Sequence, residues 1–350
     1  MLENTNTTPL SEYGEFGLID LLTKNIKIKN KSTVLGIGDD AAIINSNNRY
    51  QLVSKDLLIE GVHFDLSYCP LKHIGYKAIA SNLSDIAAMN ATPEQILVGI
   101  AVSSRYTAEA IEEVYQGMRL CCERYGVDLV GGDTTSSVSG MCISITVLGY
   151  ADSSKIVKRS TANENDLICV SGDLGAAYMG LIILEREKQV FLENQRNQPD
   201  LEGFDYLLER QLKPEPRLDI IKHLDEKNIL PTSMIDISDG LASDILHICQ
   251  QSKKGCTIYE EKLPIDSLTY DTAMDFQLIP STIALNGGED YELLFTIKQS
   301  DYEKILQLKD ISIIGHITGE NTGNYLITND KKSIPLQAQG WDAYRKKNKI

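Results

Sequence analysis

Apolar runs with strand character alternate with segments of helical periodicity in both halves of the chain, and this alternation limits the possible folds more than any other feature. The first half predicts helices at 71–89 and 108–125 and strands at 96–102, 127–130 and 142–148. The second half predicts strands at 167–170, 234–237, 291–297 and 311–317, and helices from 175, from 241 and over 302–308. Strands and helices that alternate in this way predict two α/β or α+β domains.

A polar segment separates the two halves. The sequence ADSSKIVKRSTANEND follows the apolar run at 142–148, and a chain of 350 residues is long enough for two buried cores. We therefore predict an N-terminal domain over 1–151 and a C-terminal domain over 152–350. A second polar stretch, 185–203, predicts a mobile surface segment.

The bulk composition excludes several classes of function. The net charge of −15 disfavours nucleic acid and anionic membranes as partners, because both attract surfaces rich in Lys and Arg. No apolar run is long enough to span a bilayer, and the first residues, MLENTNTTPLSEYGEF, lack the basic and apolar regions of a secretion signal. The seven cysteines form no CxxC pair, which argues against a zinc site, and their odd number and wide spacing argue against a disulfide framework. We therefore expect a cytoplasmic protein.

Acidic residues recur beside glycine or where an apolar run ends. They are Asp39, Asp40, Asp56, Asp133, Asp236, Asp239, Glu289 and Asp290. A single such acid is most often a turn residue whose carboxylate bonds the local backbone. The repetition favours a shared site instead, because ligands of α/β folds bind at the ends of strands.

Carboxylates that share a site need a cation. Two of them about 4 Å apart repel by about 4 kcal/mol at the dielectric typical of a protein surface. Oxygen ligands without His or Cys favour Mg²⁺ or Ca²⁺, and residues 236–240 lack the spacing of an EF-hand loop. Magnesium takes only one or two protein carboxylates together with waters and phosphates. The number of acids therefore predicts several magnesium ions bridged by phosphates.

Two glycine-rich segments supply backbone N–H groups that can face a phosphate at the start of a helix. They are SGDLGAA at 171–177 and GGDTTSS at 131–137, although tight turns explain the same glycines. The basic residues Lys155, Lys158 and Arg159 either contact phosphates or form a solvated linker. The chain has no P-loop and no HRD or DFG kinase motif, so a bound nucleotide requires a different fold.

Two further side chains have two interpretations each. His63, in LIEGVHFD, either contacts a substrate or hydrogen-bonds locally. Trp341, the only tryptophan, either stacks on an aromatic ligand or packs the C-terminal segment onto the core.

Seven motifs occur in an order that points to a family. They are GEFGLI, GIGDDAA, GVHF, YKAIASNLSDIAAMNATP, GGDTT, DISDGLASD and NGGEDYEL. Over almost the whole chain they resemble the thiamine-monophosphate kinases, whose superfamily includes aminoimidazole ribonucleotide synthetase. The resemblance implies a two-domain α/β (α+β) fold of the synthetase type, in which N-terminal sheet domains pair in a homodimer and a C-terminal α/β domain completes each site. It also implies transfer of the γ-phosphate of ATP to thiamine monophosphate, which gives thiamine diphosphate and ADP.

The same resemblance implies roles for individual residues. The magnesium ligands would be Asp40, Ser54, Asp56, Asp85, Asp133, Asp236 and Asp239. ATP would be bound by Gly132, Asp133, Arg159 and Ser238, with Tyr115 near the base. Thiamine monophosphate would be contacted by His63, Glu289 and Trp341. The remaining candidates are interpreted as turn residues, namely Asp39, Asp173 and Asp290.

One position departs from the family pattern. Where many relatives read S-T-D, this chain has Ser54, Lys55 and Asp56. A lysine offers no hydroxyl to a metal, so a backbone oxygen replaces that ligand or the ligand is absent. Lys55 is the one feature that favours a non-catalytic nucleotide-binding regulator over an enzyme.

Our hypothesis for the mechanism is direct in-line attack of the substrate phosphate on the γ-phosphorus, without a covalent enzyme intermediate. A phosphate monoester is already largely ionised near neutral pH, so charge neutralisation and alignment matter more than a general base. The alternatives within the superfamily are a ligase like aminoimidazole ribonucleotide synthetase and a selenide kinase. The second is disfavoured because no cysteine precedes GIGDD.

Overall fold

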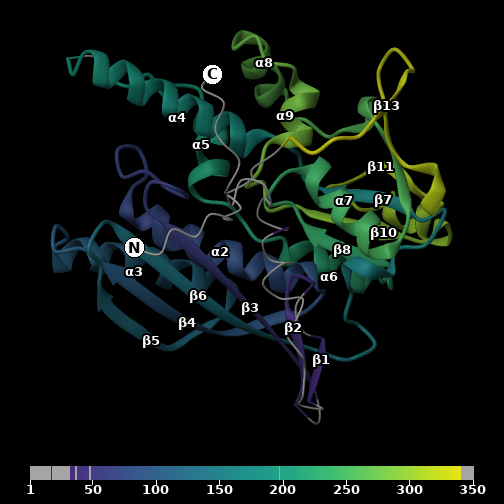
Figure 1. Ribbon diagram of the computed structural model, residues 1–350, viewed down its shortest axis with the longest axis horizontal. Helices are drawn as coiled ribbons and strands as arrows, with labels where there is room; N and C mark the ends of the chain where they lie inside the picture. The colour runs from purple at the N-terminus through teal and green to yellow at the C-terminus, as the bar shows by residue number, and fades with distance from the viewer. Residues whose placement is uncertain (1–16, 18–31, 36–37, 47–48, 197, 340–350) are drawn as a thin grey trace, which may run out of the picture.

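The computed structural model describes residues 17, 32–35, 38–46, 49–196 and 198–339, and it contains two sheets, each built from one half of the chain (Figure 1). Within these residues, no helix combines the length and the apolar character that crossing a membrane requires.

The N-terminal sheet has six strands in the order β1-β2-β3-β6-β4-β5. They are β1 (Thr33–Leu35), β2 (Ala42–Asn45), β3 (Tyr50–Ile59), β4 (Thr92–Val102), β5 (Asp128–Ser136) and β6 (Met141–Ala151). Neighbouring strands are antiparallel except β4 and β5, which are parallel. The helix α3 (Ala108–Tyr125) connects this parallel pair, and α2 (Leu71–Ala88) connects β3 to β4. Both helices pack on one face of the sheet (Figure 1).

The C-terminal sheet has seven strands in the order β13-β12-β9-β11-β7-β10-β8. They are β7 (Leu167–Ser171), β8 (Ser233–Asp236), β9 (Gly255–Tyr259), β10 (Leu293–Ile297), β11 (Ile311–Thr318), β12 (Asn324–Ile327) and β13 (Ser333–Pro335). The helices of this half are α4 (Ala176–Glu193), α5 (Asp205–Leu212), α6 (Leu218–Glu226), α7 (Leu241–Ser252), α8 (Ser267–Asp275), α9 (Pro280–Asn286) and α10 (Tyr302–Ile305). Only β9 and β12 pair in parallel, so this half is an α+β arrangement.

The helix α2 is buried on nearly all sides because it lies at the junction of the two halves. Most of its apolar side chains belong to the N-terminal core, whereas Ala87 and Ala88 pack with Phe295 of β10. Its close approach to α3 requires glycine, since a Cβ at Gly75 would lie 1.9 Å from the carbonyl oxygen of Val114. The side chains of α2 therefore reach elements of both sheets.

Most of the predicted elements are confirmed. The helices expected at 71–89 and 108–125 are α2 and α3, and Gly126 ends α3 in the left-handed conformation at φ 67°. The expected strands at 96–102, 142–148, 167–170, 234–237 and 311–317 are β4, β6, β7, β8 and β11. The division into 1–151 and 152–350 stays a prediction; β6 ends at Ala151 and β7 begins at Leu167.

The prediction of a mobile segment at 185–203 is wrong over its first half. The helix α4 continues to Glu193, with a polar face toward solvent and Glu187 buried. The Glu187 carboxylate accepts hydrogen bonds from Arg186 and from the backbone N–H of Asp200, which holds part of the following segment against the helix. The polar residues of this stretch lie on the exposed side of a helix, so their composition does not distinguish a helix from a loop.

Two local predictions about the acidic motifs are also wrong. The segment GGDTTSS does not begin a helix, because β5 continues through Gly132 and Asp133 in a parallel ladder with β4. Asp56 lies inside β3 rather than at its end.

The start of one strand also differs from the prediction. The strand expected from 291 begins at Leu293, since Tyr291 has a positive φ of 51°. By contrast, SGDLGAA does lead into a helix, α4.

Candidate functional site

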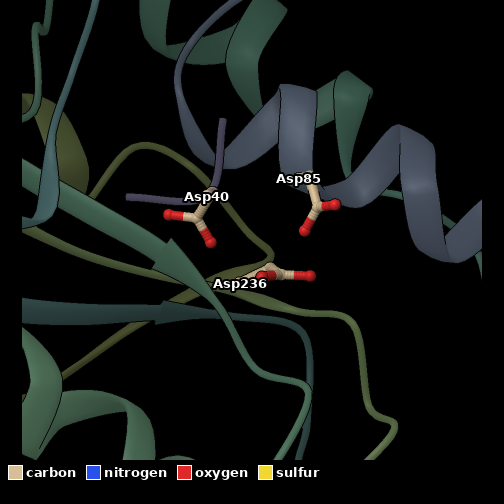
Figure 2. A group of neighbouring side chains, drawn as sticks. All are labelled: Asp40, Asp85 and Asp236. Atoms are coloured by element: carbon tan, nitrogen blue, oxygen red, sulfur yellow. The ribbon is translucent and has the colours of Figure 1, made fainter. Parts of the chain in front are cut away.

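Three aspartates from three separate elements meet at the junction of the two halves (Figure 2). Asp40 precedes β2, Asp85 lies in the last turns of α2, and Asp236 ends β8. One carboxylate oxygen of each lies within 4.8 Å of the other two, and their carboxyl groups point toward one another. In the part of the chain that the structure describes, this is the one group of three such side chains with the spacing of a metal site. We call it the acidic group.

Strand β3 and helix α2 position the second layer of this site. Ser54 of β3 donates a hydrogen bond to Asp85 Oδ2 at 2.5 Å. The backbone N–H of Asp56, two residues along the same strand, donates to the side-chain oxygen of the fully buried Asn82 at 3.2 Å. Asn82 and Asp85 are three residues apart and therefore share one face of α2. The motif NLSD thus turns an amide and a carboxylate toward β3.

The acids of this region repel one another because burial removes the water that would screen them. Burial, and then the charges of Asp56, Asp236 and Asp40, raise the pKa of Asp85 well above its ordinary value. Burial and the charge of Asp40 raise the pKa of Asp236 to about 8. In the same way, the pKa of Asp39 is raised to about 7. A bound cation would relieve this repulsion.

Arg159 is the cation that contacts the acidic group. Its Nε donates to Asp40 Oδ2 at 2.8 Å, and a second guanidinium nitrogen donates to the other oxygen of the same carboxylate. Its backbone N–H also donates to Asp39 at 3.2 Å. Asp39, interpreted from the sequence as a turn residue, therefore lies beside the acidic group. One arginine balances only part of the negative charge of these acids.

A second set of side chains lies around Glu289, in the loop before β10. One oxygen of Glu289 forms a 2.8 Å ion pair with Lys77 of α2, and the other accepts a 2.8 Å hydrogen bond from Gln211 of α5. His63 interacts electrostatically with Glu289, and its Nδ1 accepts a hydrogen bond from the N–H of Ile59 at 3.0 Å. Burial lowers the pKa of His63, and the charge of Glu289 opposes that shift. The two substrate residues predicted within the described chain are thus neighbours.

The backbone ties the Glu289 loop to the strand end that carries Asp236. The N–H of Glu289 donates to the carbonyl of Ser238 at 2.8 Å, and the N–H of Tyr291 donates to the carbonyl of Ile237 at 2.9 Å. A Cβ at Gly288 would lie 2.5 Å from the Ser238 carbonyl oxygen, so this contact requires glycine. The motifs DISDG and NGGEDYEL therefore form one packed unit that joins the acidic group to Glu289.

Asp133 does not join the acidic group within this chain. In the sheet it stands in one row with Gly99, Ser144 and Leu57. Residues in such a row share one face, and Lys55 bonds Ser144 on that face. Because side chains alternate along a strand, this is the face opposite Ser54 and Asp56. The metal roles of Asp133 and of the other predicted ligands stay predictions.

The remaining predicted residues are distributed around these two centres. Gly132 is exposed on β5, next to Asp133. Tyr115 of α3 shares a hydrogen bond with Thr134 of the same strand, and burial raises its pKa. Asp239 follows β8 near the acidic group. After burial, the charge of Asp239 is the next largest cause that raises the pKa of the buried Asp244. Trp341 lies outside the described residues.

Sequence reasoning missed three side chains that organise the site, namely Lys77, Gln211 and Asp290. Asp290, interpreted as a turn residue, is buried, and its carboxylate accepts hydrogen bonds from the N–H groups of Gly175 and Ala177 at the start of α4. Gln211 lies in none of the motifs, and Lys77 begins one of them without being given a role. Their relation to Glu289 becomes visible only when α2, α5 and the Glu289 loop are placed together.

Comparison with known proteins gives similarity over nearly the whole chain. Residues 38–151 match the family model described as AIR synthase related protein, N-terminal domain. The thiamine-monophosphate kinase of Bacillus subtilis (strain 168) is 33% identical over 337 residues, which are 95% of this chain and 99% of that protein. A solved structure described as AaThiL complexed with AMPPCP and TMP is 32% identical with a TM-score of 0.80, and the match covers 96% of this chain and 99% of that one. A chain of the HypE-HypF complex is 18% identical with a TM-score of 0.69 over 92% of this chain and 99% of its own, which shows a shared fold alone. The predicted fold class is confirmed.

Proposed function

The chain belongs to the thiamine-monophosphate kinase family, and we propose that it transfers the γ-phosphate of ATP to thiamine monophosphate, giving thiamine diphosphate and ADP. The solved relative is complexed with AMPPCP and TMP, which supports this pair of substrates. Membership of a kinase family makes the chain a phosphotransferase, and it disfavours both the ligase and the regulator as alternatives.

The observation that carries the proposal is the convergence of Asp40, Asp85 and Asp236 at the junction of the two halves. Phosphoryl transfer between two anions depends mainly on neutralising and aligning them. A group of carboxylates with too little internal positive charge suits that task, since it binds hard cations that can also hold phosphates.

The acidic group fits magnesium by the chemistry of its donors, which are carboxylates and a serine hydroxyl with neither His nor Cys among them. The proposed ligands are Asp40, Ser54, Asp56, Asp85, Asp133, Asp236 and Asp239. Several magnesium ions, when bound, would supply positive charge at the phosphates of both substrates. The raised pKa values of Asp85 and Asp236 agree with this proposal, because burial and then the charges of neighbouring carboxylates make their ionised forms unfavourable, and a bound cation would offset both effects.

In the proposed step, an oxygen of the substrate phosphate attacks the γ-phosphorus in line with the leaving group. The bond from the γ-phosphorus to the bridging oxygen of ADP breaks as the new bond forms, and its electron pair stays on ADP. Arg159, which contacts Asp40, would bind phosphate oxygens of ATP. Ser238, Gly132 and Tyr115 are the further proposed ATP contacts. No general base is required, because the attacking phosphate is already ionised.

The acceptor would be bound around Glu289 and His63, with Trp341 as a third proposed contact. A carboxylate suits a ligand that carries a cationic thiazolium ring and an aminopyrimidine, because it offers negative charge and accepts hydrogen bonds. The packed backbone between Ser238 and Glu289 keeps this carboxylate at a fixed position relative to Asp236. Such a fixed separation favours a near-attack arrangement of the two phosphates.

We further propose that 1–151 is the ATP-binding, magnesium-binding and dimerising domain, and that 152–350 completes the active site. The edge strand β5 supports the dimer, because all nine of its residues are exposed in the single chain. Val130 of β5, Leu57 of β3 and Leu97 of β4 are exposed apolar side chains of the same sheet. A long exposed edge with apolar neighbours is a surface that proteins usually cover.

A coupled assay for ADP release tests the proposed function. ADP is expected with thiamine monophosphate as acceptor, and not with thiamine or an aminoimidazole precursor. Release of ADP with none of the three would contradict the kinase proposal. Light scattering tests the assembly separately, since a monomeric mass at micromolar concentration would contradict the homodimer.

A further inference from the structure

The loop that carries Glu289 has an unfavourable backbone conformation. Glu289 and Tyr291 have positive φ angles of 66° and 51°, although neither is glycine. Such angles cost about 1 to 3 kcal/mol per residue, and they persist only when surrounding contacts fix them. The position of the Glu289 carboxylate therefore depends on groups outside the loop.

The helix α5 supplies contacts to both sides of this loop. Arg210 forms a 2.9 Å ion pair with the buried Glu292 and donates to the backbone carbonyl of Asp290 at 3.4 Å. The next residue, Gln211, donates through Nε2 to Glu289 Oε2 at 2.8 Å. Two consecutive residues of one helix thus fix the backbone after Glu289 and the side chain of Glu289 itself.

The same helix is anchored to neighbouring segments. Tyr206 donates a 2.5 Å hydrogen bond to Asp173, and Arg210 donates to the backbone carbonyl of Asp173 at 3.1 Å. Against α4 it packs so closely that a Cβ at Gly180 would lie 2.1 Å from the Leu207 carbonyl oxygen. These contacts leave α5 little freedom to shift relative to the Glu289 loop.

Lys77 connects this arrangement to the helix of the acidic group. Its Nζ lies 2.8 Å from Glu289 Oε1 and 3.2 Å from the carbonyl oxygen of Gln211, and its side chain is only 4% exposed. Lys77 and Asp85 lie on the same helix, α2. A buried ammonium group strongly favours a paired carboxylate, so Lys77 holds one oxygen of Glu289 while Gln211 holds the other.

We propose that Gln211 and Lys77 are positioning residues for thiamine monophosphate, which act by fixing both carboxylate oxygens of Glu289 while Arg210 fixes the loop behind it. This inference rests on the proposed contact between Glu289 and the substrate. Neither Gln211 nor Lys77 needs to touch the substrate. The arrangement joins α2, which carries Asp85, to the acceptor-binding loop, so the acceptor is positioned relative to the acidic group.

The test compares the KM for each substrate in Gln211→Met, which removes the donor and keeps the length of the side chain. The KM for thiamine monophosphate is expected to rise about tenfold, the effect of losing one hydrogen bond to a charged group, while the KM for ATP stays unchanged. Gln211→Asn, which keeps an amide but shortens its reach, is expected to show the same selective rise and covers the case in which Gln211→Met does not fold. Glu209→Gln is the matched control, because Glu209 lies on the same helix with a side chain 61% exposed. It should leave both KM values unchanged.

A double-mutant cycle with Glu289→Asn separates positioning from a merely structural role. Asparagine tolerates a positive φ and is too short to reach either partner. Glu289→Asn alone should raise the KM for thiamine monophosphate, and adding Gln211→Met should then change it less than twofold. If the two effects multiply, or if Gln211→Met raises both KM values equally, the positioning role is overturned while the substrate role of Glu289 stands. If Glu289→Asn leaves that KM unchanged, the substrate role of Glu289 fails, and the positioning role fails with it.

Discussion

The molecule contains two buried sets of carboxylates that differ in how the chain neutralises them. In the acidic group, Asp40, Asp85 and Asp236 face one another, and Arg159 is the arginine that contacts them. In the second set, the single carboxylate of Glu292 is paired with two arginines, Arg210 at 2.9 Å and Arg217 at 2.5 Å. The Asp290 carboxylate beside it accepts two backbone hydrogen bonds.

This difference separates a site from a structural support. Glu292 and Asp290 are almost completely buried and are bonded by groups of the chain, so no ligand reaches their carboxylates and they hold the fold. The carboxylates of the acidic group instead repel one another, as expected of the proposed cation site. Asp40 and Asp236, like Asp290 and Glu292, occur in glycine-containing acidic motifs, so residue type alone does not distinguish the two sets.

The largest effect is expected from removing one carboxylate of the acidic group. Asp85→Asn should lower kcat at least about 100-fold, or about 2.7 kcal/mol, because charge stabilisation of the transferred phosphate is lost. The magnesium-free protein should unfold at the same or higher urea concentration, since a repulsive charge has been removed. Steady-state kinetics and urea denaturation measure the two quantities. Near-normal turnover in each of the three single variants Asp85→Asn, Asp56→Asn and Asp236→Asn would contradict the proposal that several magnesium ions are bound.

The converse pattern is expected for Glu292→Gln. Removal of one partner from a buried ion pair costs about 3 kcal/mol, because the charges that remain lose a buried counterion. The free energy of unfolding, measured by urea denaturation, should fall by that amount, since Arg210 and Arg217 both lose the buried Glu292 carboxylate. Asp290 then remains 3.9 Å from Arg210, and the half-exposed Asp219 remains 3.0 Å from Arg217. Glu209→Gln again serves as the control. An unchanged free energy of unfolding in Glu292→Gln would show that Glu292 does not support the fold.

The rise in Tm on addition of Mg²⁺ should depend on the acidic group and not on Glu292. At about 100 times its Kd, a ligand of the folded state adds about 2.7 kcal/mol of stability, so Mg²⁺ should raise the Tm of the wild type. The rise should persist in Glu292→Gln and be smaller in Asp85→Asn. Differential scanning fluorimetry with Mg²⁺ and then with EDTA measures it. An equal rise in Asp85→Asn and the wild type would place the ion elsewhere.

The pH dependence of stability tests the electrostatics of Asp290. Burial raises the pKa of this carboxyl from 3.8 to about 7. A raised folded-state pKa means that the protonated form is favoured in the fold. Its contribution to stability is therefore complete below about pH 4 and is lost as the pH rises through about 7. Asp290→Asn cannot titrate, so its unfolding free energy should fall less than that of the wild type over this range. Parallel pH profiles would show that Asp290 does not titrate in this way.

The smallest effect is expected at Lys55. Its ammonium group bonds Ser144 on the sheet face opposite Ser54 and Asp56, so it does not enter the acidic group of its own chain. Lys55→Thr should therefore change kcat by less than about threefold, within the range of a surface substitution. A gain of tenfold or more in kcat would show that Lys55 impairs a metal site and that the departure from the family pattern S-T-D affects catalysis.

Local sequence patterns were sufficient for the elements and for the choice of acids. The apolar spacing of 71–89 predicted α2, and the recurrence of acids near glycine or at the end of an apolar run predicted a cation site that includes Asp40 and Asp236. Asp85 came from family resemblance, because an acid on a helix has no local signal of its own. The sequence did not predict features of the fold that depend on contacts between residues far apart in the chain. Strand β5 extends beyond its apolar run because β4 pairs with it along its length.

The roles of the acids were harder to predict than their positions. Asp290 and Asp236 both follow a glycine-containing or apolar motif, but only the fold shows that the first faces the start of α4 and the second faces Asp85. Glu289 meets Gln211, 78 residues away in sequence, and Lys77 lies farther still. No periodicity or motif spans such separations.

In the proposed reaction, the acidic group directs the γ-phosphate of ATP to thiamine monophosphate. ATP carrying a radiolabel in its γ-phosphate, incubated with thiamine monophosphate and Mg²⁺, tests this most directly. We expect the label to appear in thiamine diphosphate, the rate of labelling to fall at least about 100-fold in Asp85→Asn, and Glu209→Gln to label thiamine diphosphate at the wild-type rate. Label released only as inorganic phosphate, or transferred equally well by Asp85→Asn, would contradict it.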